Sequence, residues 1–245
     1  MGKTVLITGG SGEIGSAISK KFAENGYDVV ITYHSNSERA NKIIALLPKG
    51  NHRAFKAPTT DAEAIKHLKA DFLKHYDRLD VLVNNAGITT PVPHHDLNGL
   101  TDEWIDKIMQ TNFRGSFAMV RTFKDLLQKS SEETALIVNI SSIAGIFGIG
   151  SNVAYCASKA ALDSMTRSLA RALAPKIRIV SVSPGFVEGE YTANMDPEFL
   201  KTQKDKTPLG KFALGTDVAN AVYSLASQLT FSTGNIITVD GGRLL

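Results

Sequence analysis

The chain has almost no cysteine: Cys156 is the only one among its 245 residues. A disulfide within the chain is therefore impossible, which is typical of proteins from a reducing compartment. We expect Cys156 to be a small packing residue rather than a catalytic thiol. A helix would turn its side chain about 100 degrees away from that of its neighbour Tyr155.

Long apolar runs and a leader-like start are also missing. No stretch approaches the ~20 apolar residues that a membrane-spanning helix needs. Met1 leads directly into a strand-like run, without a charged segment followed by an apolar core. We therefore expect a cytoplasmic protein that neither spans a membrane nor carries a secretory signal.

Charge of one sign is not concentrated anywhere. Charged residues make up 21% of the chain and the formal net charge is +3, without a long basic run. This composition gives no reason to expect a nucleic-acid partner. His94 and His95 form no metal-binding pattern with nearby cysteines or carboxylates, so we expect loop residues there and no metal site.

Short apolar runs alternate with helical patterns along the whole chain. Longer helices are expected over 102–127 and 152–173, and the near-continuous apolar runs are typical of parallel strands covered on both faces. The sequence predicts an α/β fold with one Rossmann-like, doubly wound parallel sheet of about seven strands, helices on both faces, and a single domain over 1–245. The predicted strands cover 4–8, 29–33, 52–57, 79–84, 135–140, 177–182 and 236–239.

One long stretch, over 186–215, has no regular pattern. It is longer than a neutral connection between two elements of a compact domain. Such segments often cover active sites, so we predict a substrate lid there.

A glycine-rich segment, Thr8–Gly15, follows the first predicted strand and opens the first predicted helix. Glycines let the chain turn sharply and bring backbone N–H groups close to a pyrophosphate at a helix N-terminus. Glycine-rich turns are common, but a position inside a βαβ unit favours dinucleotide binding. The predicted contacts are Gly9, Ser11, Gly12, Glu13 and Ile14.

The end of the second predicted strand is where the ribose of a dinucleotide would lie. The residues there are Tyr33, His34, Ser35 and Asn36. No carboxylate occurs before Glu38, so no acid would repel a 2′-phosphate, and Arg39 lies close behind. The segment favours NADP(H) and leaves NAD(H) possible. The alternative is that these polar residues form only a solvated loop.

Tyr155 and Lys159 are four residues apart in a predicted helix and therefore share one face. An ammonium beside a phenol lowers the phenol pKa from about 10, which suits an acid or base in hydroxyl–carbonyl interconversion. Ser142, at the end of the preceding strand, could hydrogen-bond the same substrate oxygen. Taken alone, the pair is also consistent with two ordinary exposed helical residues.

Further segments complete a pattern that extends over almost the whole chain. They are Asn84-Asn85-Ala86-Gly87 after the fourth strand, Gln110-Thr111-Asn112 on the long helix, Pro184-Gly185 after the sixth strand, and Thr233-Gly234 and Val239-Asp240-Gly241-Gly242 near the end. With Ser142, Tyr155 and Lys159 at their spacing, the chain resembles the short-chain dehydrogenase/reductase family. It is similar to the compact branch that contains 3-oxoacyl-[acyl-carrier-protein] reductases.

The resemblance implies four catalytic roles. Tyr155 would be the acid or base at the reacting oxygen, Lys159 would lower its pKa and hold the nicotinamide ribose, and Ser142 would position the substrate oxygen. Asn112 would anchor a water that links Lys159 to solvent, and the coenzyme would deliver the hydride. Further coenzyme contacts are implied for Asn85, Ala86, Gly87, Pro184, Gly185 and Val187. The implied assembly is a homotetramer or a dimer.

The chain departs from the family pattern at positions that concern the coenzyme. Glu13 stands where the family has the second glycine of Thr-Gly-x-x-x-Gly-x-Gly, and Gly12 stands where a basic residue often binds the 2′-phosphate. Pro58 replaces an Asp that usually contacts the adenine, and Gly189 replaces a frequent Thr. Gly12 cannot bind a 2′-phosphate and so weakens the NADP(H) prediction. Pro58 should lose the adenine contact, and Gly189 should hold the nicotinamide carboxamide less tightly. The four catalytic positions are intact.

We therefore predict an NAD(P)(H)-dependent oxidoreductase that interconverts a carbonyl and a secondary alcohol. The leading substrate is a 3-oxoacyl thioester of acyl carrier protein or coenzyme A, and an acidic carrier could dock on the basic residues Lys201, Lys204, Lys206 and Lys211. One alternative is a dehydrogenase of sugars, polyols or other small secondary alcohols. The other is a non-catalytic NADP-binding regulatory protein.

Overall fold

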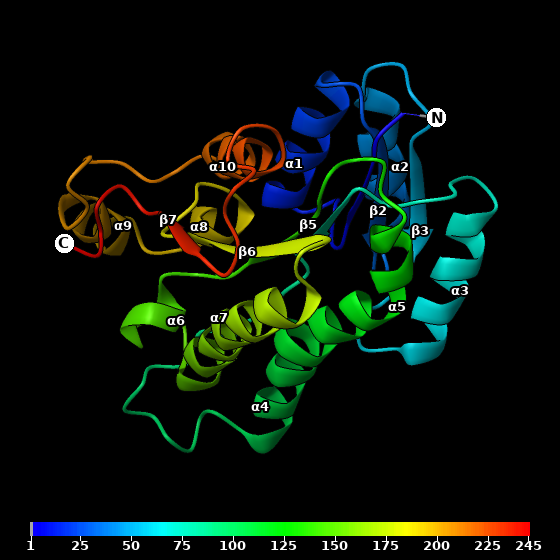
Figure 1. Ribbon diagram of the computed structural model, residues 1–245. Helices are drawn as coiled ribbons and strands as arrows, with labels where there is room; N and C mark the ends of the chain where they lie inside the picture. Colours follow the sequence, from blue (N-terminus) through cyan, green and yellow to red (C-terminus); the bar gives the residue numbers. More distant parts are fainter. Residues whose placement is uncertain (1) are drawn as a thin grey trace.

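The short apolar runs of the sequence form one parallel sheet. The structure, a computed structural model, describes residues 2–245, with the side chain of Tyr191 excepted. Within these residues seven strands pair in the order β3-β2-β1-β4-β5-β6-β7, all parallel (Figure 1). They are β1 (Thr4–Ile7), β2 (Asp28–Tyr33), β3 (Arg53–Lys56), β4 (Val81–Asn84), β5 (Ala135–Ile140), β6 (Ile177–Pro184) and β7 (Ile236–Val239). The predicted doubly wound sheet is confirmed, and its order reverses between β1 and β4, where such sheets bind ligands.

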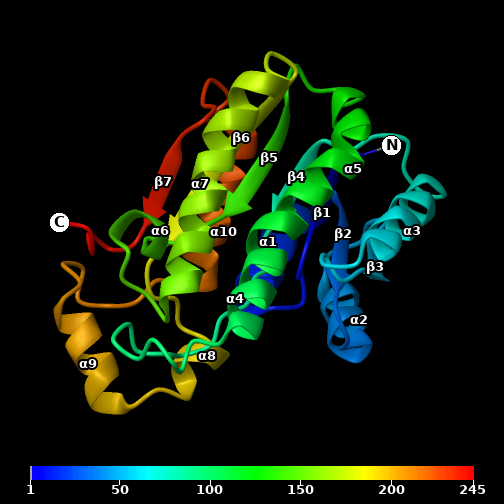
Figure 2. The ribbon, with the colours of Figure 1, turned by 90° about the horizontal axis from the view of Figure 1, so that it is seen from below.

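Helices cover both faces of the sheet (Figures 1 and 2). On one face lie α1 (Glu13–Glu24), α2 (Ser37–Leu46) and α10 (Gly215–Ser227). On the other lie α3 (Ala62–Leu73), α5 (Ser116–Gln128) and α7 (Val153–Leu173). Successive residues of a strand point to opposite faces, so Val5 packs with Phe22 of α1, whereas Leu6 packs in the core of Phe123.

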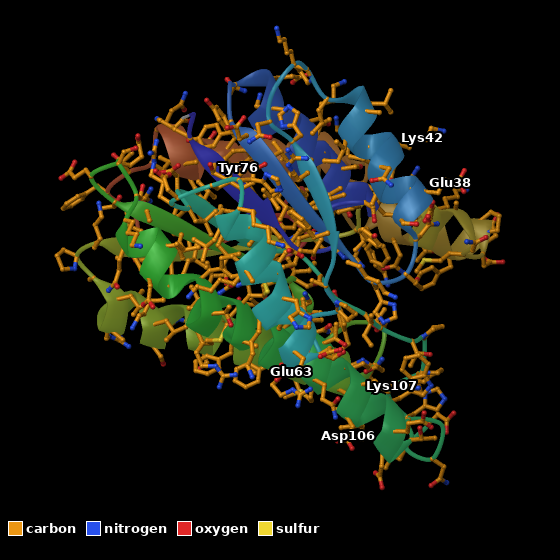
Figure 3. The ribbon with its side chains drawn as sticks, turned by 90° about the vertical axis from the view of Figure 1, so that its right-hand side faces the viewer. Glu38, Lys42, Glu63, Tyr76, Asp106 and Lys107 are labelled. Carbon is orange, nitrogen blue, oxygen red and sulfur yellow. The ribbon has the colours of Figure 1, made fainter. Side chains whose placement is uncertain are left out.

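Exposed charged side chains mark the outward faces of α2 and α4 (Asp102–Met109). Figure 3 shows Glu38 and Lys42 of α2, and Asp106 and Lys107 of α4, pointing away from the sheet. Among the described residues, no helix combines the length and the apolar character needed to cross a bilayer.

The helical stretch predicted over 102–127 is present, but its middle is a π-helix, which is wider than the predicted α-helix. Residues Gln110–Gly115 form a π-helical segment between α4 and α5. Gly115 packs closely there, since a Cβ atom on it would lie 2.8 Å from Thr59 Oγ1. Apolar periodicity does not distinguish a single wider turn from an α-helical one, and such turns are frequent at functional sites. Asn112 lies in this segment.

The lid segment, residues 186–215, is more regular than predicted. It contains α8 (Glu190–Ala193) and α9 (Pro197–Asp205). Asp196 Oδ1 caps α9 by accepting a hydrogen bond of 2.8 Å from the Phe199 N–H, with Pro197 in the first turn. Val187 pairs with Ala213 in a parallel bridge that closes the base of the segment. Figure 2 shows α8 and α9 at the carboxyl ends of the strands, with the C-terminus beside α9.

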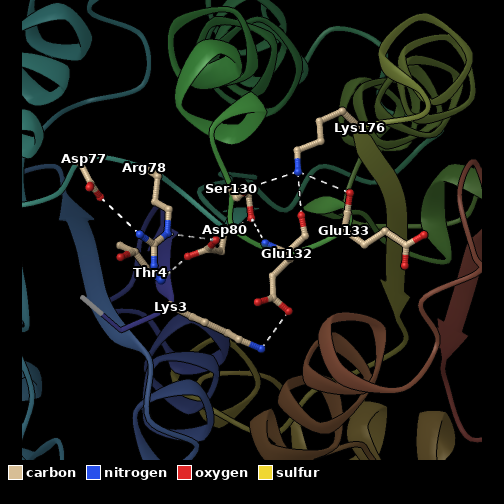
Figure 4. A network of polar contacts seen from close by, with 9 residues as sticks. All are labelled: Lys3, Thr4, Asp77, Arg78, Asp80, Ser130, Glu132, Glu133 and Lys176. Atoms are coloured by element: carbon tan, nitrogen blue, oxygen red, sulfur yellow. Dashed lines mark hydrogen bonds and ion pairs between the residues drawn. The ribbon is translucent and has the colours of Figure 1, made fainter.

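The opposite, amino edge of the sheet is held by polar contacts (Figure 4). The Asp80 carboxylate accepts hydrogen bonds from the Thr4 N–H at 2.8 Å and from the Ser130 hydroxyl at 2.5 Å. Lys176 Nζ donates to the carbonyls of Ser130 and Glu132 at 3.0 and 2.7 Å. The starts of β1, β4, β5 and β6 are thereby tied together, away from the carboxyl edge that carries the candidate site.

Candidate active site

Tyr155 and Lys159 lie one turn apart on α7. The helix begins as predicted because Asn152 Oδ1 accepts a hydrogen bond of 2.7 Å from the Tyr155 backbone N–H. The Lys159 Nζ lies 5.6 Å from the centroid of the Tyr155 ring and donates a hydrogen bond of 2.8 Å to the carbonyl of Ile140, the last residue of β5. The structure therefore brings the two predicted side chains together at the carboxyl end of β5.

The environment of Lys159 perturbs its charge. Its side chain is buried, and burial lowers the pKa of the ammonium from 10.5 to about 8, while the Asp163 carboxylate acts in the opposite direction. Asp163, one turn further along α7, is buried too, and burial raises the pKa of its carboxyl group. A lysine in this state can exchange a proton close to neutral pH.

Ser142 lies on a turn that packs against α7. Its Oγ accepts a hydrogen bond of 3.2 Å from the Ala144 N–H at the start of α6 (Ala144–Phe147). Gly145 makes the packing possible, because a Cβ atom on it would lie 2.7 Å from the backbone of Lys159. Ser142 is thus carried on a turn that contacts the backbone of α7 at Lys159.

Asn112 links the segment after β4 to α7. Its buried amide accepts a hydrogen bond of 2.8 Å from the Ile88 N–H and donates to the Ile88 carbonyl and to Ser158 Oγ, both at 3.0 Å. Ser158 in turn donates to the Tyr155 carbonyl at 2.8 Å. A Cβ atom on Gly87 would lie 3.4 Å from Asn112 Oδ1 and 3.5 Å from Lys159 Nζ, so Gly87 passes between these groups. The predicted water at Asn112 stays a prediction.

The glycine-rich loop has the geometry of an anion cradle. Gly9 adopts a φ of +62°, and a Cβ atom on Gly15 would lie 2.4 Å from the Gly9 carbonyl oxygen. Gly12 precedes α1, and no side chain caps the first turn of this helix. The N–H groups at the start of α1 therefore remain open to a phosphate. Ser11 lies half-buried on the loop, and Ile14 packs against the core.

Asn85 and Ala86 hold this loop against the end of β4. Their backbone N–H groups both donate to Thr8 Oγ1 at 3.0 Å. Asn85 Nδ2 donates to the carbonyls of Thr8 and Gly9, also at 3.0 Å. The residues present thus fit the pyrophosphate of a dinucleotide, because two strand ends meet around an uncapped helix N-terminus.

The predicted ribose segment lies beside the glycine-rich loop. The Gly10 N–H donates to the Thr32 carbonyl at 3.1 Å, next to Tyr33 at the end of β2. His34 and Ser35 are exposed, whereas Asn36 has a structural task. Its Oδ1 caps α2 by accepting a hydrogen bond of 2.8 Å from the Arg39 N–H.

Pro184 and Gly185 connect β6 to neighbouring parts of the site. The Pro184 carbonyl accepts from the Ile143 N–H at 3.1 Å, beside Ser142, and the Gly185 N–H donates to the Val239 carbonyl at 3.0 Å. Val187 then enters the lid segment.

Glu13 and Gly189, two departures from the family pattern, pack against each other. A Cβ atom on Gly189 would lie 2.8 Å from Glu13 Cγ. The Glu13 side chain therefore extends toward the lid segment and occupies the space that a side chain at position 189 would need. Nothing in the sequence shows that positions 13 and 189 meet.

Two polar residues near the site were not predicted. Ser158 and Asp163 lie three and four residues beyond Tyr155 and Lys159, respectively, on α7. Their helical spacing was a signal that could have identified them, because residues at these spacings share a face.

Comparisons with known proteins agree with this geometry. A family model described as "Enoyl-(Acyl carrier protein) reductase" matches residues 10–243. The 3-oxoacyl-[acyl-carrier-protein] reductase FabG of Staphylococcus aureus is 34% identical over 249 aligned residues, covering 100% of this chain and 99% of that protein.

Solved structures are similar over the same length. The short-chain dehydrogenase/reductase "SDR:Glucose/ribitol dehydrogenase" of Brucella melitensis has a TM-score of 0.91 at 29% identity, covering 99% of this chain and 97% of that one. The RhlG/NADP active-site complex of Pseudomonas aeruginosa has a TM-score of 0.90 at 30% identity, covering 99% and 96%. The chain belongs to the short-chain dehydrogenase/reductase family and is an NAD(P)-dependent oxidoreductase.

Proposed function

We propose that this chain reduces the carbonyl of a 3-oxoacyl thioester to a secondary alcohol with NADPH. The proposal rests first on Tyr155 beside the buried Lys159, at the strand end that leads to Ser142. The name of the Staphylococcus aureus relative, a 3-oxoacyl-[acyl-carrier-protein] reductase, supports the substrate class.

Tyr155 is the proposed proton donor to the substrate oxygen. Its hydroxyl gives a proton to the carbonyl oxygen as negative charge develops there, and the nearby Lys159 ammonium stabilises the resulting phenolate. The Ser142 hydroxyl donates a hydrogen bond to the same oxygen. We propose that Lys159 then returns a proton to Tyr155 and regains one from solvent through a water held near Asn112. The nicotinamide coenzyme, when bound, supplies the hydride to the carbonyl carbon.

The surface after Ser142 favours an acyl substrate over a sugar. Ile146, Phe147 and Ile149 are 49%, 48% and 74% exposed, an unusual clustering of large apolar side chains next to a polar site. Phe186 and Phe212, at the two ends of the lid segment, stack with ring centroids 5.1 Å apart. We propose that Ile146, Phe147, Ile149 and Phe186 bind the acyl chain, that the buried Phe212 supports Phe186, and that the lid segment closes over the chain.

The coenzyme preference and the assembly are part of the proposal. NADP(H) is favoured by the absence of an acid at Tyr33–Asn36 and by the similarity to RhlG, which was solved as a complex with NADP. We propose a homotetramer that packs α5 and α7 against neighbouring copies, supported by Phe117 and Val153, which are 40% and 47% exposed on these helices. Light scattering of the purified protein tests the assembly.

The decisive experiment compares Tyr155→Phe with Tyr223→Phe. The first variant should lose roughly 10²- to 10⁴-fold in turnover of a 3-oxoacyl thioester because it lacks the acid, and it should still bind NADPH in a calorimetric titration. Tyr223, on α10, packs beside Phe22 in the last turn of α1, at the end of that helix away from the glycine-rich loop, and its variant should keep full turnover. Retained turnover in Tyr155→Phe would contradict the assigned mechanism.

A dehydrogenase of sugars or polyols is the second candidate, favoured by the similarity to the Brucella melitensis protein, which is named a glucose/ribitol dehydrogenase. Turnover of the wild-type protein on a panel of 3-oxoacyl thioesters, ketones, sugars and polyols separates the two. Oxidation of a polyol without thioester reduction would select this candidate. Coenzyme binding without any turnover would favour a regulatory protein.

A further inference from the structure

An ion pair connects the lid segment to the start of α2. Arg39 Nη1 lies 2.8 Å from Oε1 and 2.9 Å from Oε2 of Glu190, so one guanidinium nitrogen bridges both carboxylate oxygens. The two residues are 151 positions apart in the chain. The other ion pair of the lid segment in the described part of the chain, Lys204 with Glu188 at 3.5 Å, is internal to it.

Arg39 lies near the strand end where this fold binds the adenosine ribose of a dinucleotide. The 2′ position of that ribose carries a phosphate in NADP and a hydroxyl in NAD. Arg39 is in the first turn of α2, directly after the segment Tyr33–Asn36 at the carboxyl end of β2. A cation is unfavourable in the first turn of a helix, because the helix dipole is positive there. Its backbone is fixed by the Asn36 cap, and its side chain is about one-third exposed. An arginine near this strand end can bind the 2′-phosphate of NADP.

Glu190 places negative charge beside that guanidinium. A 2′-phosphate and the Glu190 carboxylate would compete for the same donors and would repel each other. Glu13 packs against Gly189, directly before Glu190, and is a second carboxylate on this side of the lid segment. Glu13 lines a cavity of about 340 Å³ between α1, α2 and the base of the lid segment together with Lys20 and Glu188, and Glu188 is paired with Lys204. Displacing Glu190 from Arg39 would also remove the lid segment's ion pair to α2.

We propose that Glu190 lowers the preference for a coenzyme with a 2′-phosphate by competing with that phosphate for Arg39. A coenzyme with the 2′-phosphate displaces Glu190 and frees the lid segment from α2. A coenzyme with a 2′-hydroxyl leaves the ion pair intact. The inference rests on the proposed NADP(H)-dependent function and adds a residue of the lid segment to its coenzyme specificity.

Calorimetric titration with NADP⁺, NAD⁺, 2′,5′-ADP and ADP tests the proposal on the wild type and on Glu190→Gln, Arg39→Gln and the double variant. Exposed ion pairs are weak, so Glu190→Gln should raise affinity for NADP⁺ and 2′,5′-ADP only about two- to five-fold, with NAD⁺ and ADP unchanged. Arg39→Gln should lower affinity for the 2′-phosphate ligands about tenfold or more, and adding Glu190→Gln to it should have no further effect.

Two control variants separate competition from a general change of charge. Glu188→Gln removes a carboxylate whose ion-pair partner lies within the lid segment, and Glu38→Gln removes one next to Arg39 that points outward on α2 (Figure 3). Both should leave the ratio of NADP⁺ to NAD⁺ affinity near the wild-type value.

The outcomes are distinct. An equal gain for NADP⁺ and NAD⁺ in Glu190→Gln, a gain that persists without Arg39, or no gain at all would each overturn the proposal. A wild-type preference for NAD⁺ would contradict the proposed coenzyme. If Glu190→Gln still gained affinity selectively for 2′,5′-ADP, the competition for Arg39 would be supported all the same.

Discussion

We expect the buried Lys159 to lower the free energy of unfolding at neutral pH. Burial lowers the pKa of its ammonium from 10.5 to about 8, so the folded protein binds this proton less tightly than the unfolded chain does. One pKa unit corresponds to 1.36 kcal/mol, so the shift costs about 3 kcal/mol of unfolding free energy at pH 7. Between pH 8 and 10.5 the unfolded chain holds more protons at this site than the folded protein does. The stability of a protein that carries Lys159 (the lysine form) therefore rises with pH in this range, and about 1 kcal/mol of the cost remains at pH 10.

The test replaces Lys159 with Met, which has a similar length and no charge. Tyr155→Phe serves as the background, so that titration of the phenol does not contribute, and Tyr155→Phe is compared with Tyr155→Phe/Lys159→Met. The methionine leaves the Ile140 carbonyl without its donor, which offsets part of the gain by about 1–3 kcal/mol at every pH. The stability difference between the two variants should therefore move by about 2 kcal/mol, in favour of the lysine form, from pH 7 to pH 10.

Urea unfolding followed by circular dichroism, at pH 7, 8.5 and 10 and one protein concentration, measures this difference. The other titrating groups are common to both variants and cancel, apart from Asp163, whose carboxyl group interacts with Lys159 and whose pKa the substitution also changes. A difference that stays constant from pH 7 to pH 10 would refute the reasoning, because it would mean that Lys159 titrates as it does in the unfolded chain.

Two further predictions concern the coenzyme loop and the fold. Gly15→Ala should lower coenzyme affinity at least tenfold in a calorimetric titration, because its Cβ atom would lie 2.4 Å from the Gly9 carbonyl oxygen; unchanged affinity would show that the loop adapts. Arg178→Met should lower the unfolding free energy by about 3 kcal/mol in urea, because Arg178 donates to the carbonyls of Leu225 in the last turns of α10 and of Leu229 and Ser232 beyond it. A loss below about 1 kcal/mol would show that water replaces these hydrogen bonds.

The residues that carry the chemistry could be recognised because they follow local rules. Tyr155 and Lys159 are paired by helical spacing, and the glycine-rich loop follows an apolar strand. These signals depend only on neighbouring residues in the chain. The same is true of the apolar runs, which predicted the bounds of the parallel strands to within a few residues. The π-helical segment around Asn112 was missed because apolar periodicity does not resolve one wider turn.

The chain itself determined the doubly wound sheet, the coenzyme loop and the placement of Tyr155 and Lys159 on one helical face, because each depends on patterns of a few residues. Only the tertiary structure decided contacts between segments far apart in the sequence. It buried Lys159 against Ile140 and so lowered its pKa, packed Glu13 on Gly189, and paired Arg39 with Glu190. Burial and charge pairing depend on which surfaces meet in space, and no local pattern at positions 39 and 190 announces that they will meet.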